Sequence, residues 1–390
     1  ERSVDRDSAA KALDHYCGGS VEVLISSIGT VKPVMPPTEA AAAKTRLQRA
    51  RTAYNALTAS QKALVPNYAS LQEGETAYRT YESNYAAAKA AESLISAIGT
   101  VTADSGDAIR KAQEAYDALT AEQKQLVDAR LVQQMETAAA QYRHDTYHFE
   151  KSLYVVAYQQ DLHFKQLFKV LELMGREWAK DMVHISYGMV SYEGQAMSTR
   201  KGHVVYLEDL LNLAVEKALS IINEKNPDLE NKEAIARQIG VGAVIFFDLY
   251  NNRIKDIDFY WDRALNFDGE TAPYVMYTHA RCASVLRKAG EEADAAPDYA
   301  ALADADAQNV VRLLEQFPGL LGEALERGEP SMITRYSVDL AQAFNKFYYE
   351  QRILDDDGAV RAARLNLTRA AKSVIATALS LIGVSAPERM

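Results

Sequence analysis

An internal repeat in the first third of the chain constrains its fold most strongly. The run Leu24-Ile-Ser-Ser-Ile-Gly-Thr-Val31 recurs as Leu94-Ile-Ser-Ala-Ile-Gly-Thr-Val101. A second run, from Ala53 to Val65, recurs from Ala115 to Val127. The spacing between the runs differs because the first copy has a longer, proline-containing connector. Two copies of one pattern predict two copies of one small folding unit.

Each copy of the repeat predicts three helices. The first helix ends at the Ile-Gly-Thr sequence, which is a C-cap pattern, and the second carries Arg, Ala, Tyr and Leu at helical spacing. The third begins near Thr58 in one copy and near Thr120 in the other. Thr120 and Gln123 also have the spacing of a capping box.

Tyr54 and Tyr116 lie on the apolar stripes of the second helices, beside Leu57 and Leu119. Aromatic residues in such stripes belong to a core more often than to a ligand site, and we assign them to the core. The two copies resemble helical-bundle repeats of secreted and surface proteins of Gram-positive bacteria. That resemblance implies architecture or adhesion, not chemistry.

The pattern changes after the repeats. Residues 152–158 predict a short buried parallel strand, residues 162–174 a helix ended by Gly175, and residues 182–191 a second buried strand. This order is typical of the end of a doubly wound domain, where ligands bind beyond the carboxyl ends of strands. From about Leu207 onward the pattern is helical almost throughout.

A compact polar cluster follows the second predicted strand, within Gln195-Ala-Met-Ser-Thr-Arg-Lys-Gly202. Ser198 and Thr199 can donate hydrogen bonds, and Arg200 and Lys201 supply positive charge. The cluster suits a loop that closes over polyphosphate. Taken alone, the same residue types also form ordinary solvated turns.

Length, charge and composition limit the number of domains and the kinds of ligand site that the chain can have. The 390 residues have room for two or three domains, and the net charge of −10 does not indicate a nucleic-acid binder, so contact with RNA requires a local basic patch. Cys17 and Cys282 show no metal-ligand spacing, which favours a reducing compartment and no metal site. The charged run from Glu1 to Asp7 is not a signal peptide, and no run of about 18 apolar residues predicts a membrane span.

Motifs spread from about Ala138 to Met390 resemble, in order, the C-terminal half of arginyl-tRNA synthetases, the class I ligases that attach arginine to tRNA. Besides the cluster at 195–202, the matching stretches are Tyr142–Phe149, Leu153–Phe164, Ile235–Ala243, Asp256–Phe259, Tyr274–Arg281, Phe344–Tyr348, Ala363–Leu365 and Ala386–Met390. The resemblance implies a nucleotide-binding domain followed by an all-α anticodon-binding domain.

The resemblance also implies roles in catalysis. Ser198, Thr199, Arg200 and Lys201 would stabilise charge on pyrophosphate during adenylate formation, with ATP and Mg²⁺ as the substrate complex. Gln160 and His163 would bind arginine. From the residues alone, Gln160 could instead satisfy backbone groups at a helix start, and His163 could simply pack.

Tyr336, Asn345, Tyr348 and Met390 match family positions associated with anticodon contacts, where aromatic faces stack on bases and amides read base edges. These residues could equally belong to the core. The chain also departs from the family pattern: Ala196 stands where the class signature has its first Lys, and no His-x-Gly-His motif occurs in the 390 residues. Half of the expected site is therefore absent from this sequence.

We therefore predict a mainly α chain that combines three-helix repeats, a partial α/β Rossmann-like domain and an all-α anticodon-binding domain. The predicted divisions are an uncertain segment at 1–19, repeats at 20–83 and 88–137, a partial catalytic domain at 138–270 and the anticodon-binding domain at 271–390. The seam lies near Ala138. The run from Arg6 to Ala10 also resembles a helix-start motif of the synthetases, with Ser3 where the family has Tyr, although an Ala-rich chain can produce this match by coincidence. The acidic segment 290–306 predicts a solvated loop.

The function that this organisation favours is arginine–tRNA ligation by descent, with arginine and its tRNA as partners, in a cytoplasmic monomer without membrane contact. Whether the chain catalyses the reaction alone stays open at this point, because the His-x-Gly-His half is absent. Two other functions compete: a non-catalytic tRNA-binding module, and a surface repeat protein that carries a synthetase remnant.

Overall fold

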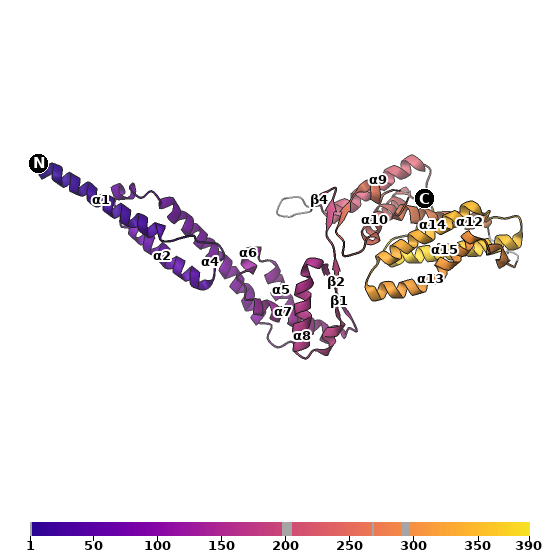
Figure 1. Ribbon diagram of the computed structural model, residues 1–390, viewed down its shortest axis with the longest axis horizontal. Helices are drawn as coiled ribbons and strands as arrows, with labels where there is room; N and C mark the ends of the chain where they lie inside the picture. Colours follow the sequence, from indigo (N-terminus) through magenta and orange to yellow (C-terminus); the bar gives the residue numbers. More distant parts are fainter. Residues whose placement is uncertain (1, 197–204, 267–268, 291–295) are drawn as a thin grey trace. The chain divides into compact units, whose positions relative to one another are not determined.

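The computed structural model describes residues 2–196, 205–266, 269–290 and 296–390 (Figure 1). The chain divides into two compact units, one comprising residues 1–152 with 165–182 and the other residues 153–164 with 183–390. Both are mainly helical, as the sequence predicts. Among the described residues, no helix has the length and apolar composition needed to cross a bilayer.

Long helices joined by single-turn helices build the repeat region (Figure 1). Their bounds are α1 (Arg2–Ser26), α2 (Pro37–Asn55), α3 (Ala59–Lys62), α4 (Tyr68–Ser96), α5 (Gly106–Asp117), α6 (Ala121–Lys124) and α7 (Ala129–Tyr147). Helix α4 runs through the border between the two sequence copies. Its first part packs in the core of the first copy through Leu71, and its last part packs in the core of the second copy through Ile95.

The third helix predicted in each copy begins at the expected residue but lasts only one turn. Thr58 and Gln61 form a capping box at the start of α3, and Thr120 and Gln123 form the equivalent box at α6. In the first copy Pro66 follows soon afterwards, and a proline cannot continue the hydrogen-bonding of a preceding helix. In each copy a longer helix, α4 or α7, starts beyond the single turn.

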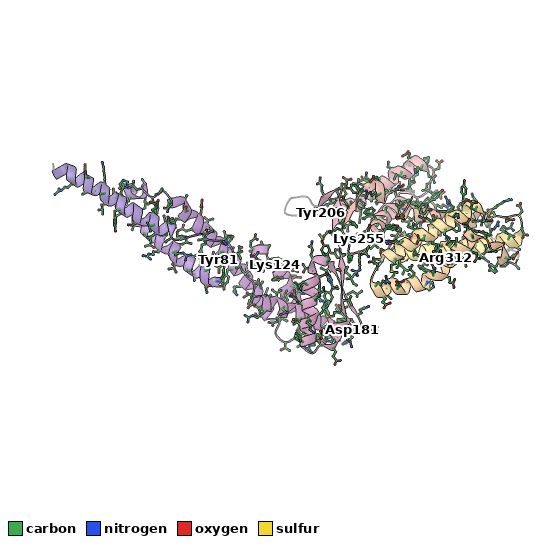
Figure 2. The ribbon with its side chains drawn as sticks, viewed as in Figure 1. Tyr81, Lys124, Asp181, Tyr206, Lys255 and Arg312 are labelled. Atoms are coloured by element: carbon green, nitrogen blue, oxygen red, sulfur yellow. The ribbon has the colours of Figure 1, made fainter. Side chains whose placement is uncertain are left out.

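The two repeat tyrosines pack as the sequence predicts. Tyr54 stacks on Tyr68 with ring centroids 4.1 Å apart, and both rings lie against the first apolar core. Tyr116 packs against the second core, and the Lys124 ammonium lies 5.0 Å from its ring centroid. Figure 2 labels Lys124 and also Tyr81, a buried ring of α4.

Helix α7 crosses Ala138 without interruption. Ala138 and Ala139 are buried and pack in one cluster with Ile95 and Ile109 of the second repeat copy. Ala138, where the resemblance to helical repeats gives way to the resemblance to synthetases, therefore lies within a continuous helix and in the core of the second repeat.

The predicted nucleotide-binding region forms two small sheets. Its elements are β1 (Ser152–Ala157), η1 (Tyr158–Gln160), α8 (Asp161–Leu173), η2 (Glu177–Asp181), β2 (Met182–Tyr187), β3 (Val190–Tyr192), β4 (Gln195–Ala196), β5 (Ile257–Phe259) and α11 (Trp261–Ala264). One sheet contains β1 and β2, and the other has the order β4-β3-β5. Strand β3 runs parallel to β5, with Ser191 opposite Asp258, and antiparallel to β4.

Two sequence predictions for these strands were wrong. The strand predicted over 182–191 breaks at Gly188, where a Cβ atom would overlap the Lys255 carbonyl of a neighbouring segment. The strand predicted as buried over 152–158 leaves Leu153 and Val155 exposed at 55% and 63%. The reason is that only the opposite face of β1 is covered within the described part of the chain.

Six long helices form the remaining core of the second unit (Figure 1). They are α9 (Leu207–Lys225), α10 (Lys232–Tyr250), α12 (Ala272–Ala289), α13 (Ala305–Arg327), α14 (Ser331–Glu350) and α15 (Gly358–Leu381), with the short helix η4 (Tyr299–Leu302) before α13. Phe344, Leu340 and Ile375 are completely buried among them. The helices of residues 271–390 agree with the predicted all-α character of that region, while α9 and α10, which precede it in sequence, pack in the same core.

Part of the acidic segment 290–306 is ordered structure, contrary to the prediction of a solvated loop. The Asp304 carboxylate caps α13 by accepting hydrogen bonds from the backbone N–H groups of Asp306 and Ala307. The Asp306 carboxylate lies 2.8 Å from the Lys346 ammonium. Acidic side chains at a helix start are stabilising because they complement the helix dipole.

Candidate functional site

Gln160 and His163 lie just beyond the end of β1. Gln160 is exposed in η1, and His163 is half-buried one turn later on α8. The His163 ring packs edge-on against Phe164, with centroids 5.1 Å apart. The two side chains therefore lie on the segment where a doubly wound fold binds ligands.

His184, for which the sequence predicted no role, fixes this segment. His184 on β2 has Nε2 2.9 Å from the Val156 carbonyl and Nδ1 3.1 Å from the Asp161 carboxylate. Asp161 follows Gln160 directly, so His184 ties β2 both to β1 and to the turn that carries Gln160. The sequence signal for it was a polar residue within a mainly apolar strand.

Ser198, Thr199, Arg200 and Lys201 lie outside the described residues. The hairpin that leads to them is built around Asp258, whose carboxylate accepts hydrogen bonds from the Gly194 N–H at 3.0 Å and the Ser191 hydroxyl at 2.9 Å. The Gly194 N–H and the Tyr260 hydroxyl lower the pKa of Asp258 below its usual value. The carboxylate thus holds the turn between β3 and β4.

The described residues contain no group of three or more His, Cys, Asp or Glu side chains placed to hold a metal ion. Cys17 and Cys282 are both free thiols. Burial raises the pKa of the Cys282 thiol to about 12, so it stays protonated at neutral pH.

Asn345 lies at the centre of a polar network between α12 and α14. Its amide nitrogen donates to the Tyr274 hydroxyl at 3.0 Å and to the Thr278 hydroxyl at 2.8 Å, and its carbonyl oxygen accepts from Arg281 at 2.5 Å. Both amide hydrogens are thereby engaged within the protein. In this structure Asn345 orients Arg281. An RNA base could accept a hydrogen bond from the Asn345 amide nitrogen only by displacing the bonds to Tyr274 and Thr278.

Arg281 lies between two tyrosine rings. Its guanidinium carbon is 4.9 Å from the ring centroid of Tyr277 and 5.0 Å from that of Tyr348. The two rings are 46% and 38% exposed. Planar groups held in this way present stacking surfaces to an unpaired base. From the sequence, Tyr348 was predicted to contact tRNA, whereas no contact was predicted for Arg281 or Tyr277.

Tyr336 has a different setting from Tyr348. It is buried, its hydroxyl donates to the Leu313 carbonyl at 2.8 Å, and its ring stacks on Phe317. Burial raises its pKa to about 12. The structure therefore places Tyr336 in the core, away from any surface that could bind RNA.

Two cavities, of about 1010 Å³ and 710 Å³, surround the tyrosine and arginine stack. We call them together the aromatic groove. The residues that line both are Asn226, Tyr277, Arg281, Tyr349 and Met390. The larger cavity is also lined by Arg287, Lys288, Arg352 and Arg389, against two acidic residues, Asp228 and Glu230. This is a local basic patch in a chain of negative net charge.

The segment that carries Met390 is fixed beside the groove. The Met390 carbonyl accepts a hydrogen bond from Asn226 at 3.3 Å, and the Glu388 carboxylate lies 2.7 Å from the Lys372 ammonium. His279, buried below, has Nδ1 2.9 Å from the Pro387 carbonyl. Burial lowers the pKa of His279, so its imidazole is neutral near pH 7.

Comparison with known proteins identifies two family matches. Residues 114–261 match the family described as tRNA synthetases class I (R), catalytic domain, and residues 275–390 match the DALR anticodon binding domain. The first match begins inside the second repeat copy.

Curated relatives include the arginine–tRNA ligases of Halothermothrix orenii, 55% identical over 255 residues, and of Clostridioides difficile, 53% identical over 255 residues. Each alignment covers 65% of this chain and 45% of the relative, so the chain spans about half the length of these proteins.

A solved structure, the arginyl-tRNA synthetase of Thermus thermophilus, is similar with a TM-score of 0.57 and 35% identity over 62% of this chain and 41% of that chain. These similarities agree with the resemblance found in the sequence. Residues 114–261 are therefore similar to the catalytic domain of class I arginyl-tRNA synthetases, and residues 275–390 are similar to a DALR anticodon binding domain.

Proposed function

We propose that residues 138–390 act as the C-terminal part of an arginine–tRNA ligase and bind the tRNA for arginine through the aromatic groove. The observation that carries the proposal is the Arg281 guanidinium held between Tyr277 and Tyr348 beside a basic cavity. Exposed aromatic faces stack on unpaired anticodon bases, and the surrounding cations neutralise phosphates.

In the ligase reaction the arginine carboxylate attacks the α-phosphate of ATP, supplied with Mg²⁺, and pyrophosphate leaves. Arg200 and Lys201, with the hydroxyls of Ser198 and Thr199, would stabilise the charge that accumulates on pyrophosphate. Residues on the Gln160 and His163 segment would position arginine. The hairpin held by Asp258 leads directly into the cationic segment, which supports its place beside the nucleotide.

The second candidate is a tRNA-binding module without catalysis, in a cytoplasmic monomer. It is favoured by the absence of a His-x-Gly-His motif from the 390 residues and by the uncovered face of β1. In either case the repeats would add architecture or adhesion, as their resemblance to Gram-positive surface repeats implies.

Fluorescence anisotropy with labelled tRNA for arginine tests the groove. We expect Tyr348→Ala to weaken binding by about 1–3 kcal/mol, the usual value of a base stacked on an aromatic ring. Tyr299→Ala is the matched control, because Tyr299 is 60% exposed but does not line the groove. Binding should also fall as salt rises, because the cations of the groove neutralise phosphates, and the slope should be shallow because their number is small. Equal affinity for every tRNA tested would exclude a specific anticodon site.

A further inference from the structure

Arg253, in the loop between α10 and β5, joins two parts of the second unit. Its guanidinium donates through Nε to the Gly328 carbonyl at 3.0 Å and through Nη1 to the Ser186 carbonyl. Gly328 ends α13, and Ser186 belongs to β2. Because a planar guanidinium donates in fixed directions, it can hold two carbonyls at a set spacing. Arg253 therefore holds the turn between α13 and α14 against β2.

The backbone of Arg253 is engaged at the same joint. Its N–H donates to the Glu329 carboxylate at 3.4 Å, and its carbonyl accepts from the Gly188 N–H at 2.7 Å. The Glu329 carboxylate also lies 4.0 Å from Nε of Arg253. The side chains of Arg253 and Glu329 are 24% and 13% exposed, so solvent ions screen their attraction only weakly.

The turn and the strand also approach each other directly. Gly328 has a φ of +58°, and a Cβ atom on it would lie 2.9 Å from Cδ1 of Ile185 on β2. Glycine adopts this backbone conformation without steric cost and leaves room for the neighbouring side chain. The close contact therefore depends on the residue type at the turn as well as on Arg253.

Strand β2 connects this joint to the proposed arginine-binding segment. His184, on the same strand as Ser186, has Nε2 2.9 Å from the Val156 carbonyl and Nδ1 3.1 Å from the Asp161 carboxylate. Asp161 follows Gln160 directly in the chain. The position of β2 therefore determines the position of the turn that carries Gln160.

Helix α14 connects the other side of the joint to the aromatic groove. The Thr334 hydroxyl, near the start of α14, donates to the Leu249 carbonyl of α10 at 2.7 Å. Further along the same helix lies Tyr348, one of the two rings that hold Arg281. Backbone hydrogen bonds hold each turn of a helix to the next, so the joint and the groove lie on one continuous element.

We propose that Arg253 is a positioning residue that sets where the Gln160 segment lies relative to α14 and its groove. The inference rests on the proposed function, because that function gives the Gln160 segment its role in binding arginine. It adds a residue that contacts neither arginine nor tRNA and acts through β2 and the α13–α14 turn.

Pulsed electron paramagnetic resonance measures this position directly. Gln160→Cys and Gln342→Cys place spin labels at exposed positions of η1 and α14 in the full chain. Cys17→Ser removes the other accessible thiol, since Cys282 is completely buried. We expect one narrow distribution of label distances, and a distribution at least twice as wide after Arg253→Ala. An equal width in both chains, or a broad distribution before the substitution, overturns the proposal.

Arg335→Ala is the matched control. The Nε of Arg335 donates to the Tyr250 carbonyl at 3.2 Å, so this arginine joins α14 to α10 instead of to β2. It should leave the distribution narrow, whereas equal broadening by Arg335→Ala and Arg253→Ala would show a general loosening and overturn the role of Arg253.

Circular dichroism verifies that each variant is folded. If Arg253→Ala were misfolded, Glu329→Gln would replace it, because it removes the charge beside the guanidinium and keeps an oxygen for the Arg253 N–H. We expect a smaller broadening from Glu329→Gln, and an unchanged width would overturn the proposal.

The tRNA assay on the same preparations separates this proposal from the proposed function. Arg253 does not line the aromatic groove, so Arg253→Ala should leave tRNA binding unchanged. An unchanged distance distribution in a chain that binds tRNA for arginine would refute the role of Arg253 alone. Absence of specific tRNA binding by the unsubstituted chain would refute the proposed function, while broadening by Arg253→Ala would still show that Arg253 sets this position.

Discussion

The helical bundle of α12 to α15 and the β1–β2 sheet cover their apolar residues to different extents. In the bundle, Phe344 and Ile375 are completely buried, whereas in the sheet Leu153 and Val155 are more than half exposed. The bundle also satisfies its central polar group, since Asn345 makes three hydrogen bonds within the protein. The difference teaches that a helical bundle can enclose its apolar side chains on all sides, whereas a two-stranded sheet covered on one face leaves the apolar side chains of its other face exposed.

The largest expected effect of this difference is on catalysis. We expect the chain alone to give no arginine-dependent ATP–pyrophosphate exchange, because the His-x-Gly-His half of the site is absent from the sequence. Removing one electrostatic contact typically costs about 3–4 kcal/mol, and several are lost together. Exchange at the rate of an intact synthetase, abolished by Lys201→Ala, would contradict this expectation.

Stability should show the same contrast between the two regions. Phe344→Ala should lower the free energy of unfolding by about 3–5 kcal/mol, since it leaves a cavity in a closed core. Leu153→Ala should change it by less than about 0.5 kcal/mol, because the side chain is already exposed. Guanidinium denaturation of both variants measures the difference. Equal losses would show that the two regions are packed alike.

Asn345 tests whether the bundle and the groove depend on each other. Asn345→Ala removes the acceptor for Arg281 and the donors to Tyr274 and Thr278, so we expect a loss of about 1–3 kcal/mol in stability. Binding of tRNA should weaken as well, because Arg281 is no longer held between its tyrosines. If Asn345→Ala reduced stability but left affinity unchanged, the network would belong to the core alone.

The smallest expected effect is the change in the free energy of unfolding with pH that His279 causes. The pKa of buried His279 lies below its ordinary value of 6.5, so below that pH the unfolded chain binds more protons than the folded one. The free energy of unfolding should therefore be steady above pH 6.5 and decline as the pH falls toward 5. His279→Asn should flatten this decline, while His15→Asn, at an exposed position of α1, should not. A profile unchanged by His279→Asn would show that another group titrates.

The features that could be predicted from sequence are those fixed by nearby residues. The capping boxes at Thr58 and Thr120 join residues three apart, and the structure shows both. The existence of β1 also followed from its β-rich residues, but its burial did not, because burial depends on which elements cover each face. For the same reason Tyr336 and Tyr348, which both match anticodon-contact positions of the family, have separate positions: Tyr336 is buried in the core and Tyr348 is partly exposed.

The sequence by itself determined the mainly helical character, the repeat, and the resemblance to a synthetase, because periodicity, caps and ordered motifs are properties of the chain. Only the tertiary structure brought Arg281 of α12 between Tyr277 and Tyr348 and showed that Asn345 orients it. It likewise showed that His184 joins β1 to the Gln160 turn. Apart from the Arg281–Tyr277 contact, which lies within one helix, these contacts link residues tens of positions apart, and their geometry follows from helix and sheet packing rather than from local sequence.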